Sequence, residues 1–511
     1  MAEPSEKLAN SLEILKEFQD SGRTAIRSRD ISRTHRERLL KNGFIKEVIK
    51  GWYVPSRPDE GQGESTAWYA SYWVFLTSYL NERYGNDWSL SPEQSLLLHA
   101  SNSAVPRQLL IRSPNGSNNT TPFPFETSLV DTRQETPKAK DMVERNGLHL
   151  YTIEAGLISA SPNFFGHHAN EARALLAALP DTSGLLARLL DGGHSVVAGR
   201  LAGALRSIGN TRAADEIVKT MKAADYDVRE TDPFENRIEI GGGQRTVSPF
   251  VLRLQLMWQE MREPIIELFP AAQPVHDIKA YLEKVDEIYV TDAYHSLSIE
   301  GYQVSVELIE RVRSGDWNPD TIEGDREHRN ALAARGYHLA FQEVKKGVEK
   351  ILKGHDAAEL ADAAHGDWYR ELFTPSVTAG IIKPSGLAGY RGIQVYIRTS
   401  RYTPPPYEEV REAMPALFDL LRKEENAAVR IVLGHFVFVY IHPYVDGNGR
   451  IGRFLMNLMM AAAGLPWTVI PVERRTEYMT ALEALSVDQD VRPFTTFLAE
   501  LVRTPVEARV K

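Results

Sequence analysis

The first fifty residues alternate between helical and strand-like hydrophobic patterns. Apolar residues recur every three or four positions over residues 7–19, which predicts an amphipathic helix. Residues 34–41 form a second, short helical pattern that an Asn-Gly pair ends. Residues 44–54 are largely apolar on either side of a Lys-Gly turn, which predicts a hairpin. The pattern therefore predicts a small domain over residues 1–55, with two helices followed by a β wing.

The rest of the pattern divides the chain twice. Residues 55–64 are rich in Pro and Gly and predict a linker. Helical stretches then flank short strand-like runs, which predicts a mixed α/β domain over residues 65–235. A glycine-rich break near residue 240 precedes helical periodicity, which predicts a helical domain over residues 245–511. The expected fold class is thus multidomain and mainly α.

The composition excludes several kinds of chemistry. The 511 residues include no Cys, which excludes disulfide scaffolds, cysteine nucleophiles, thiolate zinc sites and iron–sulfur clusters. The amino terminus carries charges throughout and has no apolar signal segment. The longest nearly apolar run, residues 431–441, is too short to cross a bilayer. We therefore expect a soluble, cytoplasmic protein with no membrane partner.

Charge is distributed unevenly along the chain. The formal net charge is −9, yet residues 21–50 hold nine Lys or Arg residues against three acids. A basic module in an acidic chain predicts a local contact with a polyanion. With the helix–turn–helix–wing outline, this favours a winged helix that contacts DNA phosphates. The candidate DNA contacts on the second helix are Arg33, Arg36, Arg38 and Lys41. The alternatives are a solvated basic helix and a winged helix that binds protein.

One short stretch, residues 442–453, concentrates residues that could carry chemistry. Residues 427–440 predict a buried helix, and Pro443 stops it one residue after His442. The chain then turns through Asp-Gly-Asn-Gly, and residues 450–463 predict a second helix. His442 therefore stands just before a glycine-rich turn that leads into a helix N-terminus.

The turn and the second helix suit an anion. Gly447, Asn448 and Gly449 can adopt positive φ and present successive backbone N–H groups at a helix N-terminus. Arg450 and Arg453 lie three residues apart, so they share a helix face and can grip phosphate oxygens. These features predict a phosphate-binding site.

Two further side chains extend this prediction. Asp446 stands at the edge of the turn, where it could hold Mg²⁺ on a polyphosphate. His442 titrates near neutral pH and could take a proton from an incoming hydroxyl. Each residue alone has an ordinary structural explanation, and a metal pair of His435 with His442 lacks a third ligand. Together the residues predict a phosphoryl- or nucleotidyl-transfer site.

The stretch from His442 to Arg453 resembles the signature of the Fic family, H-x-F-x-[DE]-G-N-G-R-x-x-R, with Tyr444 where the family has Phe. The resemblance extends over residues 280–500. It implies an all-helical core that transfers AMP from ATP, with Mg²⁺, to a serine, threonine or tyrosine hydroxyl of a target protein or of itself. In that reaction His442 would deprotonate the hydroxyl and Asp446 would bind Mg²⁺. The residues that would hold the nucleotide phosphates are Gly447, Asn448, Gly449, Arg450 and Arg453.

Residues 389–406 fit the same resemblance. They predict a small β-hairpin or edge strand closed by prolines, which could pair with an extended partner segment. The Fic family has a flap at this place that aligns the target side chain. The corresponding docking residues are Gln394, Val395, Tyr396 and Ile397. A purely structural hairpin is the alternative.

The segment from Ser296 to Gly301 resembles the family's inhibitory motif, [ST]-x-x-x-E-[GN], and predicts an inhibitory helix near residues 286–301. A Glu300 carboxylate that reaches Arg453 would hold the guanidinium intended for the γ-phosphate. ATP could then bind only in a non-productive pose. An ordinary acid at a helix end is the alternative.

The N-terminal half has a fainter resemblance to the winged helix that opens AbiEi-type antitoxins and related regulators. Three functions stay open. The favoured one is an autoinhibited protein adenylyltransferase. Residues 447–449 are Gly-Asn-Gly, without the bulky or basic side chain that would obstruct the triphosphate. The second is a Fic-fold enzyme that transfers phosphate or another nucleotide. The third is a DNA-binding, antitoxin-like regulator whose Fic half senses nucleotide, although a sensor would not need His442. The oligomeric state is left open, with a homodimer as one option.

Overall fold

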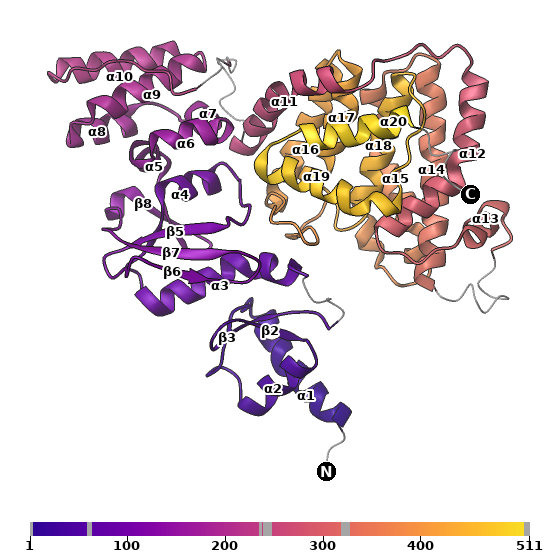
Figure 1. The fold of residues 1–511 in the computed structure, drawn as a ribbon, viewed down its shortest axis with the longest axis horizontal. Helices are drawn as coiled ribbons and strands as arrows, with labels where there is room; N and C mark the ends of the chain where they lie inside the picture. The colour runs from indigo at the N-terminus through magenta and orange to yellow at the C-terminus, as the bar shows by residue number, and fades with distance from the viewer. Residues whose placement is uncertain (1–3, 59–63, 235–237, 239–247, 318–327, 505–511) are drawn as a thin grey trace. The chain divides into compact units, whose positions relative to one another are not determined.

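The computed structural model describes residues 4–58, 64–234, 238, 248–317 and 328–504 (Figure 1). The predicted glycine-rich break near residue 240, and residues 59–63 of the predicted linker, lie outside the described part. Two compact units divide the chain. The N-terminal unit comprises Met1–Arg253 and Tyr396–Thr403, and the C-terminal unit comprises Leu254–Val395 and Pro404–Lys511. Within the described residues, we find no helix with both the length and the apolar character needed to cross a membrane.

The N-terminal unit opens with two helices and a three-stranded antiparallel sheet of order β1-β3-β2. These elements are α1 (Pro4–Asp20), β1 (Ile26–Arg27), α2 (Arg33–Lys41), β2 (Ile45–Ile49) and β3 (Trp52–Pro55). Ser32 caps α2 because its side chain accepts a hydrogen bond from the backbone N–H of His35. Leu15, Ile26 and Leu39 are buried in a common core. The helices and the hairpin lie where the hydrophobic pattern predicts them, and the winged-helix assignment stays a prediction.

A mixed sheet of order β4-β5-β7-β6 forms the middle of this unit, with β5 and β7 parallel. Its elements and their neighbours are α3 (Thr66–Tyr84), β4 (Ser89–Leu90), α4 (Pro92–His99), β5 (Gln108–Ser113), β6 (Asn119–Pro122), β7 (Ser128–Arg133), β8 (Met142–Arg145) and β9 (Leu148–Tyr151). Buried aromatic side chains of α3, including Trp68 and Phe75, share a core with strands β4, β5 and β7.

Small helices complete the N-terminal unit and form a second core rich in Ala and Leu. They are α5 (Ile153–Ser159), α6 (Pro162–His167), α7 (Ala169–Ala178), α8 (Ser183–Gly192), α9 (Ser195–Ser207) and α10 (Thr211–Ala223). The order of strands and then helices matches the predicted α/β region.

The regular elements in the described part of the C-terminal unit are helices, joined by loops (Figure 1). Its helices, with α11 beginning in the preceding unit, are α11 (Pro249–Leu268), α12 (Ile278–Ile299), α13 (Val306–Ser314), α14 (His328–Leu352), α15 (Ala357–Thr378), α16 (Tyr407–Lys423), α17 (Ala427–Ile441), α18 (Asn448–Ala462), α19 (Arg475–Asp488) and α20 (Arg492–Arg503). Buried residues of α17 and α18 form much of its core. The mainly α fold class is therefore confirmed.

One local prediction is wrong: residues 389–406 form no strand, so there is no β-hairpin at the flap position. Residues 404–406 are prolines, which have no backbone N–H to donate to a ladder. The carbonyls of Pro404 and Pro405 accept hydrogen bonds from side chains instead of from a strand. The Gln394 amide donates to the Pro404 carbonyl over 2.9 Å, and the Arg391 guanidinium donates to the Pro405 carbonyl over 2.6 Å.

Candidate active site

The signature residues lie where α17 ends and α18 begins. Asn426 starts α17, because its side-chain oxygen accepts hydrogen bonds from the backbone N–H groups of Ala428 and Val429. His442 ends it in a left-handed conformation, with φ 54° and ψ 59°. Pro443 then prevents any continuation of the helix. The imidazole is thereby placed at the end of a rigid, buried helix.

The side chain of Asn448 closes the loop between the two helices. Its Oδ1 accepts a hydrogen bond from the Tyr444 backbone N–H over 2.9 Å, and its Nδ2 donates to the Tyr444 carbonyl over 2.8 Å. Asn448 is buried, with 2% of its surface exposed. Both ends of the amide are therefore committed to the loop, so Asn448 can offer an anion only its backbone N–H.

The N-terminus of α18 has the conformation that the glycines predict. Gly447 is the N-cap, with φ 85°, a left-handed value that favours glycine. A Cβ added to Gly449 would lie 2.4 Å from Oε1 of Glu300. The Glu300 carboxylate thus lies against the first turn of α18, where backbone N–H groups and the helix dipole favour an anion.

Glu300 is bound there by Arg453. Nη2 of Arg453 donates to Oε1 of Glu300 over 2.7 Å. Its Nε donates to Oγ of Ser296 over 2.8 Å, and Nη2 also donates to the Ser296 carbonyl over 3.1 Å. Burial acts to lower the pKa of Arg453, but the Glu300 carboxylate together with Tyr478 and Tyr337 outweighs it and raises that pKa above its ordinary value. The structure thus brings Ser296, Glu300 and Arg453 together, as the inhibitory motif predicts.

Arg450 is buried beside this contact, with 1% of its side chain exposed. Its guanidinium lies 5.3 Å from the ring centroid of Tyr302 and 5.1 Å from that of Phe373. Nη2 also lies 3.2 Å from Oδ1 of Asp446. Burial opposes the positive charge, but Asp446, Tyr302 and Glu300 together outweigh it, so the pKa of Arg450 is raised.

Both arginines retain a donor that can take a further acceptor. Within the described residues, Nε of Arg450 and Nη1 of Arg453 are buried without a hydrogen-bond partner. Such buried donors are costly to leave unsatisfied. They fit an additional set of acceptors, such as phosphate oxygens, at the N-terminus of α18.

His442 has the geometry of a neutral general base. Its Nδ1 lies 3.1 Å from the Val439 carbonyl. A carbonyl only accepts, so Nδ1 carries the proton of this bond and Nε2 keeps its lone pair. Burial, with a smaller contribution from the Arg391 charge, lowers the pKa of His442 to about 4. The imidazole is therefore neutral near pH 7 and can accept a proton.

Asp446 is the candidate Mg²⁺ ligand, and 60% of its side chain is exposed. Its Oδ1 accepts from the Gly447 backbone N–H over 2.6 Å. No cluster of three or more His, Asp or Glu residues suited to a metal occurs in the described part of the chain. A single carboxylate fits Mg²⁺, which keeps waters and binds substrate phosphates, better than a metal held by protein ligands alone. Nε2 of His435 lies 2.8 Å from the Tyr478 hydroxyl, so this nitrogen is engaged within the helical core.

The boundary between the two compact units falls within the four predicted flap residues. Gln394 and Val395 belong to the C-terminal unit that carries His442, whereas Tyr396 and Ile397 belong to the N-terminal unit. There the following residues bind α3 and its flank: Arg398 pairs with Glu64 over 2.7 Å, and the Thr399 N–H donates to Thr66 over 3.0 Å.

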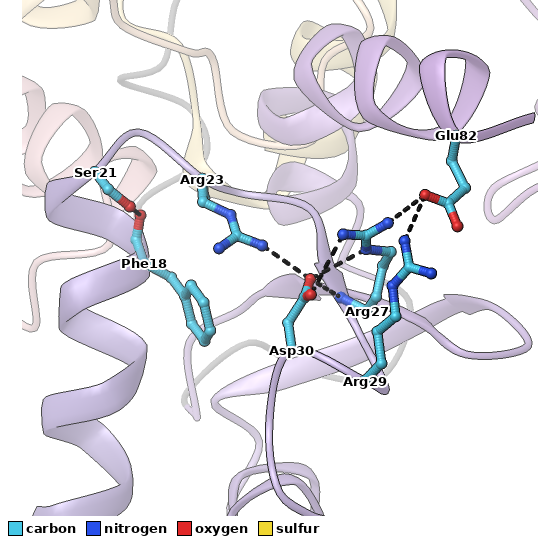
Figure 2. Close-up of polar contacts among 7 residues, drawn as sticks. All are labelled: Phe18, Ser21, Arg23, Arg27, Arg29, Asp30 and Glu82. Carbon is cyan, nitrogen blue, oxygen red and sulfur yellow. Dashed lines mark hydrogen bonds and ion pairs between the residues drawn. The ribbon is translucent and has the colours of Figure 1, made fainter. Parts of the chain in front are cut away.

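The basic residues near the N-terminus are largely engaged within the chain. Figure 2 shows Arg23 and Arg27 bound to Asp30, and Arg27 and Arg29 bound to Glu82 of α3. Because two acids pair with three arginines here, this part of the basic segment presents less free charge than its arginines alone suggest.

Three of the four candidate DNA contacts on α2 also bind other groups within the chain. Arg33 pairs with Glu37 over 2.6 Å. Arg36 donates to the Ser28 carbonyl over 3.1 Å, and Arg38 donates to the Lys7 carbonyl over 2.6 Å. Lys41 is exposed. Arg36 and Arg38 therefore have roles in holding this domain together, which the sequence pattern does not reveal.

Sequence reasoning also missed residues that support the site. Arg391, Tyr302 and Phe373 contact the loop or Arg450, yet none lies in the signature. Arg391 does stand in the stretch that resembles the flap. That stretch holds three arginines, so charge alone does not single out Arg391, and its partners are backbone carbonyls, which leave no trace in a sequence.

Comparisons with known proteins agree with this site. The profile of the Fic/DOC family matches residues 359–460. Protein adenylyltransferase fic-1 of Caenorhabditis elegans is 30% identical over 219 residues, which are 42% of this chain and 40% of that protein. Protein adenylyltransferase Fic of Drosophila grimshawi is 29% identical over 237 residues, 45% of each chain. The matches thus span less than half the length of these relatives.

A solved structure of C. elegans Fic-1 (aa134 - 508) is also similar, with a TM-score of 0.37 and 20% identity over 67% of this chain and 95% of that one. The family match runs from the first turn of α15 to the last turn of α18, and it includes the loop with His442. The Fic/DOC family model therefore matches the segment of this chain that carries the stretch from His442 to Arg453.

Proposed function

We propose that this protein is an adenylyltransferase that transfers AMP from ATP to a hydroxyl side chain of a target protein. The observation that carries the proposal is the N-terminus of α18, where two buried arginines retain unsatisfied donors near a histidine with a free Nε2. Relatives named protein adenylyltransferases are similar to this chain over 219 and 237 residues, at 30% and 29% identity. The geometry therefore supports both an anion site and a base.

The reaction follows from these groups. Backbone N–H groups at residues 447–449, with Arg450 and Arg453, hold the phosphates of ATP. Nε2 of His442 takes the proton of a serine, threonine or tyrosine hydroxyl, and that oxygen attacks the α-phosphorus. The bond from the α-phosphorus to the bridging oxygen breaks, and pyrophosphate leaves. Mg²⁺, held by Asp446 when bound, would neutralise charge on the phosphates.

Glu300 restrains this reaction in the proposed account. Its carboxylate bonds Arg453 and lies against Gly449, so it competes with a phosphate oxygen for the same charge. A triphosphate that binds while Glu300 stays must place its γ-phosphate elsewhere. Replacing Glu300 with Gly removes the competing carboxylate and frees Arg453, so transfer increases.

The test uses the full chain carrying Glu300→Gly in a cell lysate with Mg²⁺ and ATP labelled on the α- or the γ-phosphate. Protein-bound label from the α-phosphate, lost with His442→Ala, supports the proposal. Glu283→Gly, which alters an exposed acid on the same helix, is the matched control and leaves transfer at the basal level. If protein-bound label appears only from the γ-phosphate, the protein transfers phosphate instead. If no label appears from either phosphate, adenylyl transfer and phosphate transfer are both rejected.

DNA binding by residues 1–55, a cytoplasmic location and a homodimer stay predictions. The first is tested by retention of the full chain on duplex DNA at low salt, with charge reversal of Arg33 as the variant. Arg33 is exposed and pairs only with a neighbouring acid, so its reversal leaves the fold of this domain in place. Retention that resists reversal and salt would reject phosphate contact.

A further inference from the structure

Arg391 is a buried arginine outside the signature that binds the catalytic loop. Only 3% of its surface is exposed. Its Nε donates to the His442 carbonyl over 2.8 Å, and its backbone N–H donates to the Pro443 carbonyl over 2.9 Å. One residue therefore fixes two successive peptide groups at the point where α17 ends.

The same guanidinium also holds the segment at the flap position. Nη1 of Arg391 donates to the Ile393 carbonyl over 3.0 Å, and Nη2 donates to the Pro405 carbonyl over 2.6 Å. In the sequence, these two carbonyls flank Tyr396–Thr403, the segment that belongs to the N-terminal unit. The three nitrogens of one planar group thus connect the catalytic loop to both ends of the flap in this unit.

The contact falls where the backbone most needs support. His442 has φ 54°, and a non-glycine residue pays a conformational cost in this region. Its carbonyl points away from the α17 ladder and requires another donor. The charged donor of Arg391 supplies it, so the orientation of the imidazole depends on this bond.

We propose that Arg391 is a positioning residue that aligns His442 with the flap, so that the base and the target hydroxyl are held at a fixed position relative to each other. This inference rests on the proposed adenylyl transfer and adds a residue that touches neither nucleotide nor hydroxyl. Arg391 acts through two carbonyl contacts on the catalytic loop and two on the flap. Its charge has a second effect, because it helps to keep the pKa of His442 low.

Lysine cannot replace Arg391 in this role. A planar guanidinium presents donors in a fixed fork, which matches three carbonyls that approach from different directions. An ammonium on a flexible stem retains the charge but not the fork. Arg391→Lys therefore separates the geometric effect from the electrostatic one, and Arg391→Met removes both.

Arg430 provides the matched control at the opposite end of α17. Its Nε donates to the Glu424 carbonyl over 2.5 Å and its Nη2 to the Arg422 carbonyl over 3.4 Å. It is thus also an arginine that binds backbone carbonyls, but it has no contact with the loop. Arg430→Lys and Arg430→Met report what loss of such contacts does to stability alone.

The experiment places these variants in the full chain with Glu300→Gly and measures label transfer from α-labelled ATP to lysate protein. We expect Arg391→Met to lower the maximal rate about 100-fold, as a small misplacement of a base does. The KM for ATP and the affinity for ATP should stay unchanged, because the carbonyls that Arg391 binds belong to residues 393, 405, 442 and 443 and not to the α18 N-terminus. Arg391→Lys also lowers the maximal rate, whereas both Arg430 variants retain it.

The pH profile gives a readout that loss of stability alone would not move. His442 faces the charges of Arg391, Glu300 and Asp446. Glu300 is absent in the test background and Asp446 is present throughout. Removing the cation in Arg391→Met raises the pKa of His442, so the acid limb of the rate moves to higher pH. In Arg391→Lys the limb stays close to that of the parent.

Hydrogen exchange separates this inference from the proposed reaction. Arg391→Met should speed amide exchange over residues 439–447, and Arg430→Met should not. A parent that transfers no label rejects the proposed function, while the exchange result still shows whether Arg391 holds the loop. Unchanged exchange over this loop, or a parental maximal rate and pH profile in Arg391→Met, would overturn the positioning role.

Discussion

Replacing Asn448 with Ala tests how the loop between α17 and α18 is held. The substitution removes two hydrogen bonds, one to the Tyr444 N–H and one to the Tyr444 carbonyl. Tyr444 is buried, with 1% of its surface exposed, so water cannot replace both bonds easily. At about 1–3 kcal/mol for each buried group left unsatisfied, the free energy of unfolding should fall by roughly 2–6 kcal/mol.

The assay is urea unfolding of the full chain, followed through a probe in the C-terminal unit. Asn426→Ala is the matched control, because Asn426 caps α17 from an end with no part in the loop. Loss of such a cap costs about 1 kcal/mol, so Asn448→Ala should destabilise the unit more. Equal destabilisation by the two variants would refute the closing role of Asn448.

Three further predictions follow from contacts in the site. Glu300→Gln keeps the shape of the side chain but removes its charge, so Arg453 should bind ATP phosphates more tightly. Nucleotide titration against the parent chain measures this change. Unchanged affinity for ATP would show that the Glu300 carboxylate does not compete with the phosphates. Because the pKa of His442 is lowered to about 4, the base is neutral above that pH. The kcat/KM for transfer should then be flat near neutrality and decline only on acidification through that pKa; a decline centred near the ordinary histidine value would contradict the buried base. Tyr444→Phe should preserve transfer, since Tyr444 stacks on Tyr369 at 4.0 Å through its ring, and a large loss would assign its hydroxyl a role.

The local conformation around His442 follows from the sequence more directly than the contacts that surround it. The signature predicts the helix–turn–helix around His442 because prolines, glycines and apolar periodicity are local signals. The approach of Glu300 to Arg453 was predictable only through the resemblance to the inhibitory motif, since 153 positions separate the two residues. No local pattern encodes which distant helix packs against α18.

The flap shows where pattern reasoning failed and why. Alternation and flanking prolines favoured a hairpin, but the carbonyls of Pro404 and Pro405 bind side chains rather than a strand. The contacts of Arg391 cannot be predicted from the sequence, because main-chain carbonyls occur at every position and nothing shows which of them an arginine binds. Charge at the N-terminus was counted correctly, but its pairing with Glu82 arises from tertiary packing (Figure 2).

The central claim is tested most directly by identifying the group that reaches the target. The Glu300→Gly chain is incubated with ATP, Mg²⁺ and lysate, and modified proteins are analysed by mass spectrometry beside the same reaction with His442→Ala. The account predicts adenosine monophosphate joined to a serine, threonine or tyrosine oxygen, absent from the His442→Ala sample. A phosphate alone on that oxygen, or adenylylation that persists without His442, would contradict it.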